Sequence, residues 1–214
     1  MTRRVHSLVL AAAALLVVAR PALAGPPLLC FPFDIGAAKS LPMGPQGWES
    51  VDPRYNVSHL VDDTLALLTP QTPIIERMET LRRATVYAAR NPKQAGALLD
   101  TLQRRAAVSD ANAGLAVFDF GYLAETYKQA AFIKGSTTGM AKEIDGYGLV
   151  QKALSLTGAK AMTFALVAMN MDKTHGVQQL REHVAAARDA AKTDATVRSN
   201  LASHWPETIV QYQH

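Results

Sequence analysis

The chain has 214 residues, of which 49% are hydrophobic and 19% are charged, and its formal net charge is +4. This length suits one ordinary globular domain with a substantial core, and the apolar content excludes wholesale disorder. The single cysteine excludes an intrachain disulfide framework and a cysteine-rich zinc or iron–sulfur site within one chain.

Residues 1–24 have the pattern of a secretory signal peptide. Arg3 and Arg4 form a short basic start, and residues 7–18 form an apolar run that is too short to span a bilayer. Residues 22–24 read Ala-Leu-Ala, which is the small-residue pattern that signal peptidase reads. We therefore expect cleavage after Ala24 and export to the periplasm or beyond, by the Sec or the twin-arginine route.

Cleavage would change the charge balance of the protein. Residues 1–24 hold three arginines and no acidic residue, so 19 of the 22 basic residues would face 18 acidic ones in the mature chain. The basic character thus belongs mostly to the signal, and we expect neither a nucleic-acid partner nor a membrane span after cleavage.

Residues 25–57 are rich in proline and glycine, a composition that does not support a long helix. The segment also contains large apolar side chains such as Leu28, Phe31 and Trp48. We predict an extended arm that lies along a helical body, with a disordered tail as the alternative. Cys30 in this arm is either a small buried hydrophobe or half of an intermolecular disulfide.

Residues 58–214 are predicted to form a single all-α domain. Apolar residues recur at three- and four-residue steps, and strand signals are almost absent. A short helix is expected over 58–68, and capping residues predict further helix starts near 73, 92, 110, 145, 159, 176 and 194. We expect helical hairpins packed as a bundle or as a short solenoid-like array, without a named repeat.

A local excess of positive charge marks residues 73–107, which carry seven basic residues against three acidic ones. Such a face suits another protein or an anionic component of the cell envelope. A solvated helix pair, or a pair covered by the acidic N-terminal arm, explains the same charges. The candidate interaction surface comprises Arg82, Arg83, Arg90, Lys93, Arg104 and Arg105.

The helix expected over 111–132 is apolar on most of its circumference, which is typical of a central helix. Asp119 and Glu125 lie within it. A carboxylate in an apolar wall has a raised pKa and suits a general acid, unless it reaches the surface or meets a Lys or Arg of a neighbouring helix. The aromatic and methionine residues nearby suggest a ligand pocket lined by Phe118, Tyr122, Met162 and Phe164.

The sequence contains no catalytic motif of a known spacing and no cluster typical of a metal or cofactor site. We therefore expect a non-catalytic protein-interaction or scaffold module that needs no cofactor. The alternative is a periplasmic carrier of a small apolar ligand. An enzyme built on Asp119 or Glu125 is a third hypothesis.

Overall fold

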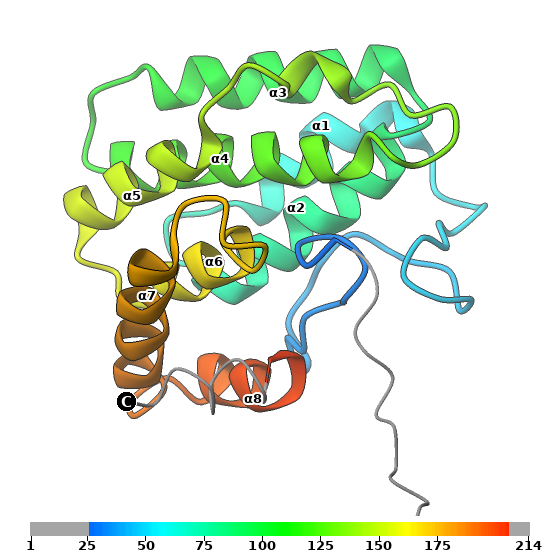
Figure 1. The fold of residues 1–214 in the computed structure, drawn as a ribbon. Coiled ribbons are helices and arrows are strands. Elements are labelled where there is room, and N and C mark those ends of the chain that lie inside the picture. Colours follow the sequence, from blue (N-terminus) through cyan, green and yellow to red (C-terminus); the bar gives the residue numbers. More distant parts are fainter. Residues whose placement is uncertain (1–25, 206–214) are drawn as a thin grey trace, which may run out of the picture.

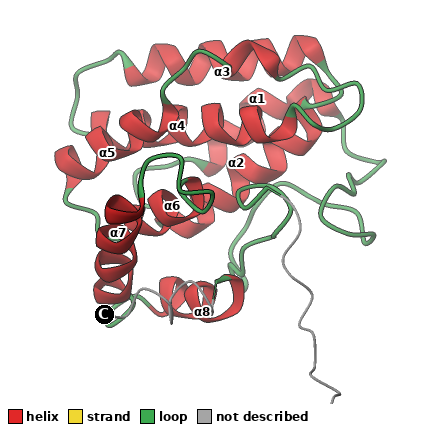
Figure 2. Ribbon diagram, viewed as in Figure 1, coloured by secondary structure: helices red, strands yellow, loops and turns green. Residues whose placement is uncertain are grey.

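The computed structural model describes residues 26–205, and its regular elements there are all helical (Figure 2). The predicted signal peptide and its cleavage site lie outside these residues. Short 3₁₀ turns at Val57–His59 and Gly139–Ala141 and one isolated bridge between Met43 and Val51 complete the elements. The α-helices are α1 (Leu60–Leu67), α2 (Ile74–Ala88), α3 (Pro92–Ala106), α4 (Ala113–Ala130), α5 (Gly146–Thr157), α6 (Met162–Met169), α7 (Val177–Ala190) and α8 (Ala195–His204).

The helix ends follow the capping residues of the sequence. The side chains of Asn91, Asp145 and Asp194 each accept a hydrogen bond from the backbone N–H three residues further on, which caps α3, α5 and α8. Gly158 ends α5 in the left-handed conformation, with φ of 65°. The helix start expected near residue 73 is found at Ile74, and Pro73 is the N-cap of α2.

Helix α4 is central, as its apolar pattern predicts, and it packs against α2, α3 and α5 (Figure 1). Its contact with α5 is close because two glycines face each other. A Cβ atom added at Gly146 would lie 2.4 Å from the carbonyl oxygen of Gly121, so neither position has room for a side chain.

Helices α6, α7 and α8 extend the structure beyond α5. All eight residues of α6 are buried, and α6 packs against both α5 and α7, while α8 contacts α7. Figure 1 shows α8 at the end of the molecule opposite to α3. The apolar run of α6 thus forms core, and no helix within residues 26–205 is long and apolar enough to cross a membrane.

The described part of the N-terminal segment, residues 26–57, contacts helices that are distant in sequence. Leu28, Leu29 and Phe33 are buried. The amide side chain of Asn200 on α8 accepts a hydrogen bond from the backbone N–H of Asp34 and donates one to its carbonyl oxygen, at 2.9 and 2.8 Å. This segment therefore connects α8 to the rest of the core.

Candidate functional site

A cavity of about 150 Å³ lies between the α1–α2 loop, α2, the end of α3 and the first half of α4. The loop between α3 and α4, which forms one wall, is at the left of Figure 1. The lining residues are Leu68, Pro70, Arg77, Arg105, Val108, Asp110, Asn112, Leu115, Ala116 and Asp119. Cavities that combine an apolar wall with a few convergent polar groups are typical of ligand-binding sites.

An ion pair between Arg77 of α2 and Asp119 of α4 forms the buried part of this cavity. Each side chain is only 1% exposed. Nη1 of Arg77 donates to both carboxylate oxygens of Asp119, at 2.9 and 2.7 Å. Arg77 and Asp119 each lie on the buried face of their helix, among apolar residues. The two charges meet because α2 packs against α4.

The remaining donors of Arg77 hold the α1–α2 loop in place. Nε donates to the carbonyl oxygen of Thr72 at 3.0 Å, and Nη2 donates to the carbonyl oxygen of Thr69. Four of the five N–H donors of the guanidinium are therefore used by protein acceptors. Arg77 positions Asp119 and the loop, and among its contacts with described residues one N–H of Nη2 has no acceptor.

The environment of Asp119 makes its carboxyl group harder to ionise than usual. Burial raises the pKa of Asp119 to about 6, although the positive charges of Arg77 and Arg105 act to lower it. The two bonds from Arg77 use two of the four lone-pair positions of the carboxylate. A further donor or cation at this carboxylate would therefore be stabilised.

Arg105 supplies a cation at the wall of the cavity. Its side chain is half-buried, and among the described residues only the Leu68 carbonyl lies within hydrogen-bonding distance, at 3.5 Å from Nη2. Asp110 faces the same cavity, and its Oδ1 accepts a hydrogen bond from the backbone N–H of Asn112 at 2.7 Å. The cavity thus carries two cations and two carboxylates.

A second buried cluster surrounds Glu79, which is fully buried on α2. Arg82 contacts both oxygens of Glu79 at 2.7 and 2.8 Å, Arg83 contacts one at 2.6 Å, and the backbone N–H of Phe33 donates to the other at 3.0 Å. Burial raises the pKa of Glu79, but the ion pairs with Arg82 and Arg83 outweigh burial and leave the pKa below its usual value.

The two arginines of this cluster also hold the N-terminal segment. Arg82 donates to the carbonyl oxygens of Leu29 and Trp48, each at 3.1 Å, and Arg83 donates to that of Leu41 at 2.7 Å. This cluster fastens residues 26–57 to α2. The negative charge of Glu79 is compensated within the protein, so we regard the cluster as structural.

The structure does not expose all of the predicted basic residues at the surface. The prediction is wrong for Arg82, whose side chain is 1% exposed because its charge is used inside the protein by Glu79. Arg83 is mostly buried on the same carboxylate. Arg90, Lys93 and Arg104 are exposed, and Arg90 lies 3.7 Å from Glu49 of the N-terminal segment.

The four residues of the predicted apolar pocket belong to the core. Phe118, Tyr122, Met162 and Phe164 are each 0% exposed, and none of them lines the cavity described above. The ring of Phe118 stacks on that of Tyr122, with centroids 5.7 Å apart. The Tyr122 hydroxyl is buried without a hydrogen-bond partner in the described part of the chain.

Of the two carboxylates of α4, only Asp119 meets a cation of a neighbouring helix, which is the alternative that the sequence analysis left open. Asp119 pairs with an arginine of another helix, while Glu125 accepts from Lys128 of its own helix at 2.8 Å and from the backbone N–H of Tyr147 at 3.1 Å. Sequence reasoning missed Arg77. The spacing of Arg77 could have indicated that it is buried. It lies three residues after Ile74 and four before Leu81, on the apolar stripe of α2.

Cys30 is half-buried in the N-terminal segment, near Arg82 and Glu49. Burial raises the pKa of its thiol, Arg82 opposes this effect, and Glu49 adds to it. A thiol with a raised pKa is a weak nucleophile near neutral pH. The intermolecular disulfide through Cys30 stays a prediction.

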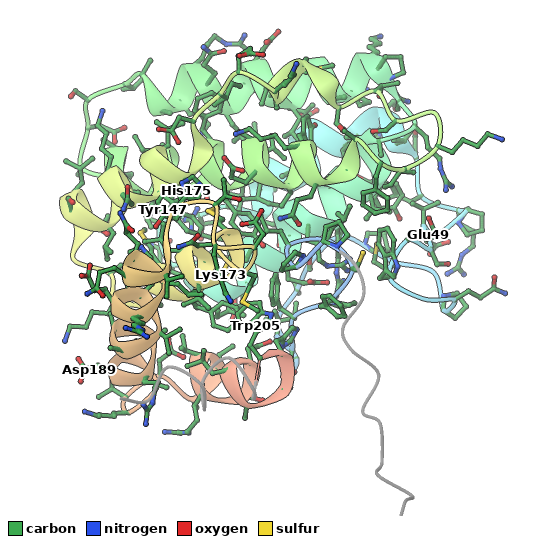
Figure 3. The ribbon with its side chains drawn as sticks, viewed as in Figure 1. Glu49, Tyr147, Lys173, His175, Asp189 and Trp205 are labelled. Atoms are coloured by element: carbon green, nitrogen blue, oxygen red, sulfur yellow. The ribbon has the colours of Figure 1, made fainter. Side chains whose placement is uncertain are left out.

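A third cluster joins α5 to α7, away from the cavity. The rings of Tyr147 and His175 stack in parallel with centroids 3.7 Å apart, and the two side chains lie together in Figure 3. The Tyr147 hydroxyl lies 2.8 Å from Nε2 of His183, and burial lowers the pKa of that histidine. Residues 26–205 contain no group of three or more His, Cys, Asp or Glu side chains arranged to hold a metal ion.

Comparison of the chain with protein-family models, with curated proteins and with solved structures found no match in any of the three searches. The arguments about function therefore rest on the cavity and its charges.

Proposed function

We propose that this protein is exported and that it binds a small ligand, without transforming it, in the cavity between the α1–α2 loop, α2, α3 and α4. The observation that carries the proposal is the pairing of that cavity with a buried carboxylate whose charge one arginine only partly compensates. A buried ion pair costs desolvation energy that an apolar pair would not, so its presence at a cavity needs a reason beyond stability.

The form of the site supports binding rather than catalysis. Asp119 is held through both oxygens by Arg77, and Arg77 is itself fixed by two backbone carbonyls. Fixed donors and acceptors with one apolar wall are suited to orienting a ligand. The sequence favoured a protein-interaction module, with a carrier of a small ligand as the alternative. We now favour the carrier, and we place its pocket at the cavity beside Asp119.

We further propose that the helices form a compact bundle rather than a solenoid-like array. The contact of α2 with α4, which skips a helix in the chain order, supports this interpretation. In a bundle, ligand sites are built from side chains on facing helices.

A second candidate function is contact with an anionic protein or envelope component through the exposed cations of α3. Lys93 and Arg104 form no ion pair within 4 Å with any described residue, which leaves their charges available to a partner. Binding to vesicles of anionic lipid should then fall when both are changed to glutamate. Unchanged vesicle binding would contradict this second function.

Native mass spectrometry tests the proposed ligand binding directly. The protein should be purified gently from the culture fluid or periplasm of expressing cells, and its native and denatured masses should be compared. We expect additional mass that is lost on denaturation. A native mass equal to that of the bare chain, in preparations that remain folded, would contradict the proposed function.

A further inference from the structure

Given the proposed binding function, we infer that the cavity takes a small zwitterionic amino acid, with its ammonium group at Asp119 and its carboxylate at Arg105. The inference rests on four features of the cavity: its separated charges, the unused hydrogen-bonding capacity of two side chains, its volume and its apolar wall.

The charges of the cavity favour a ligand that carries both signs. Arg77 and Arg105 are cationic, and Asp110 and Asp119 are anionic, so the lining sums to zero. A simple anion would bind at Arg105 but would face the two carboxylates. A simple cation would bind at Asp119 but would face Arg105. A zwitterion meets an opposite charge at each end, which both strengthens binding and rejects singly charged molecules.

Asp119 provides the ammonium-binding end. It is 1% exposed, and its two contacts with Arg77 leave two lone-pair positions on the carboxylate. An ammonium group of the ligand supplies both the missing donor and the missing positive charge. Charge-assisted hydrogen bonds of this kind are the stronger ones in proteins, especially where water is excluded.

Arg105 provides the carboxylate-binding end. The guanidinium has five donors, and among the described residues it has one long contact, with the Leu68 carbonyl at 3.5 Å. It lies near enough to Asp119 to lower the pKa of that group. Both ends of one small molecule can therefore be reached within the same cavity, and the planar guanidinium matches a carboxylate.

The size and the wall of the cavity limit the side chain of the ligand. A cavity of about 150 Å³ in another protein holds benzene, which is about as large as alanine. The apolar wall includes Leu68, Val108 and Leu115. These features favour a small aliphatic side chain over a charged or an aromatic one.

Isothermal titration calorimetry with the exported protein tests the inference. The ligands are alanine, serine, valine and proline, together with propionate and ethylamine, which each keep one charged end of alanine. We expect at least one of the amino acids to bind, and propionate and ethylamine to bind at least about tenfold more weakly. Equal binding of propionate and the amino acids, or no binding of any of the four amino acids, would overturn the inference.

A matched pair of variants locates the site. Arg105→Gln should weaken amino-acid binding by about tenfold or more, because it removes the charge that meets the carboxylate. Arg104→Gln is the control, because Arg104 is exposed on the same helix and donates only to Thr101 within that helix. Circular dichroism and melting temperature check that both variants fold. Equal losses in the two variants, or no loss in Arg105→Gln, would contradict the assignment.

The inference and the proposed function fail in different ways. Additional mass in the native spectrum combined with no amino-acid binding would leave a binding protein whose ligand is of another class. A bare native mass together with no binding in calorimetry would remove the proposed function itself.

Discussion

Glu79 and Asp119 are both buried carboxylates, and the helices that carry them, α2 and α4, pack against each other. Glu79 has two arginines and a backbone N–H as partners, and its pKa lies below the usual value. Asp119 has one arginine in contact, and burial raises its pKa to about 6. The difference follows from the number of donors that each carboxylate receives.

This difference separates a structural cluster from a candidate site. The carboxylate of Glu79 is compensated by two arginines, which also hold the N-terminal segment on α2. The carboxylate of Asp119 retains hydrogen-bonding capacity, and it lines a cavity. Burial alone therefore does not distinguish a candidate site from a structural cluster, and our proposal rests on incomplete compensation beside a cavity.

The largest effect is expected for Glu79→Gln. The substitution removes the negative charge between Arg82 and Arg83 and leaves Arg82 buried without its counter-charge. We expect the free energy of unfolding to fall by about 3–5 kcal/mol, as for other broken buried ion pairs. Urea denaturation measures this loss, and limited proteolysis should cut residues 26–57 faster than in the wild type. A loss below about 1 kcal/mol would contradict a structural role for the cluster.

Arg77→Met should have the next largest effect, because it leaves Asp119 buried without the cation that contacts it. We expect a loss of about 2–4 kcal/mol at pH 7.5 and a smaller loss at pH 5, where protonation removes the unpaired charge. The double variant Arg77→Met with Asp119→Leu is the control, since it removes both charges and should recover much of the stability. A loss that is independent of pH would argue against this explanation.

The pH dependence of stability should distinguish the two carboxylates. The pKa of Asp119 is about 6 in the folded protein and lower in the unfolded chain, so the folded state binds more protons between these values. This group's contribution to stability therefore falls as the pH rises from about 4 to 6, by about 1–3 kcal/mol. Glu79, whose pKa is lowered, contributes stability that is lost only as the pH falls below about 4.5.

The variant Asp119→Asn isolates the first of these contributions. Urea denaturation at several pH values between 4 and 7 should show the fall in stability for the wild type and a flatter dependence for the variant. Parallel curves for the two proteins would show that Asp119 does not titrate in this range.

The smallest effect is expected for Glu49→Gln, which breaks the exposed contact with Arg90 at 3.7 Å. Both side chains are more than half exposed, so we expect a change of less than about 0.5 kcal/mol in the free energy of unfolding. This variant is the surface reference for Glu79→Gln. A loss above about 1.5 kcal/mol would mean that the contact of the N-terminal segment with this surface is more important than its geometry indicates.

The sequence predicted the helices well because their signals are local. Asn91 and Asp194 cap their helices through a bond to a residue three positions away, and Gly158 ends α5 through its own conformation. The sequence also identified Asp119 as a carboxylate on an apolar wall, with an arginine or lysine of another helix as one possible partner.

The parts of the site that sequence reasoning missed depend on contacts between distant residues. Arg77 and Asp119 are 42 positions apart, and nothing in either helix alone shows that they meet. Arg82 carries the same charge as Arg104, but Arg82 faces Glu79 and the N-terminal segment while Arg104 faces solvent. The prediction of a basic surface came from a count of charges along the chain. Such a count does not show that Arg82, one of the predicted surface residues, is buried in the fold.

Carboxyl NMR titration of the folded protein tests the central comparison most directly. Carbon chemical shifts of the Glu79 and Asp119 carboxyl groups, assigned with Glu79→Gln and Asp119→Asn, should be followed from pH 3 to 8. We predict that Asp119 titrates near pH 6 and Glu79 below pH 4.5. Titration of Asp119 below pH 4 would contradict the claim that its charge is only partly compensated, and with it the argument for a ligand site at this cavity.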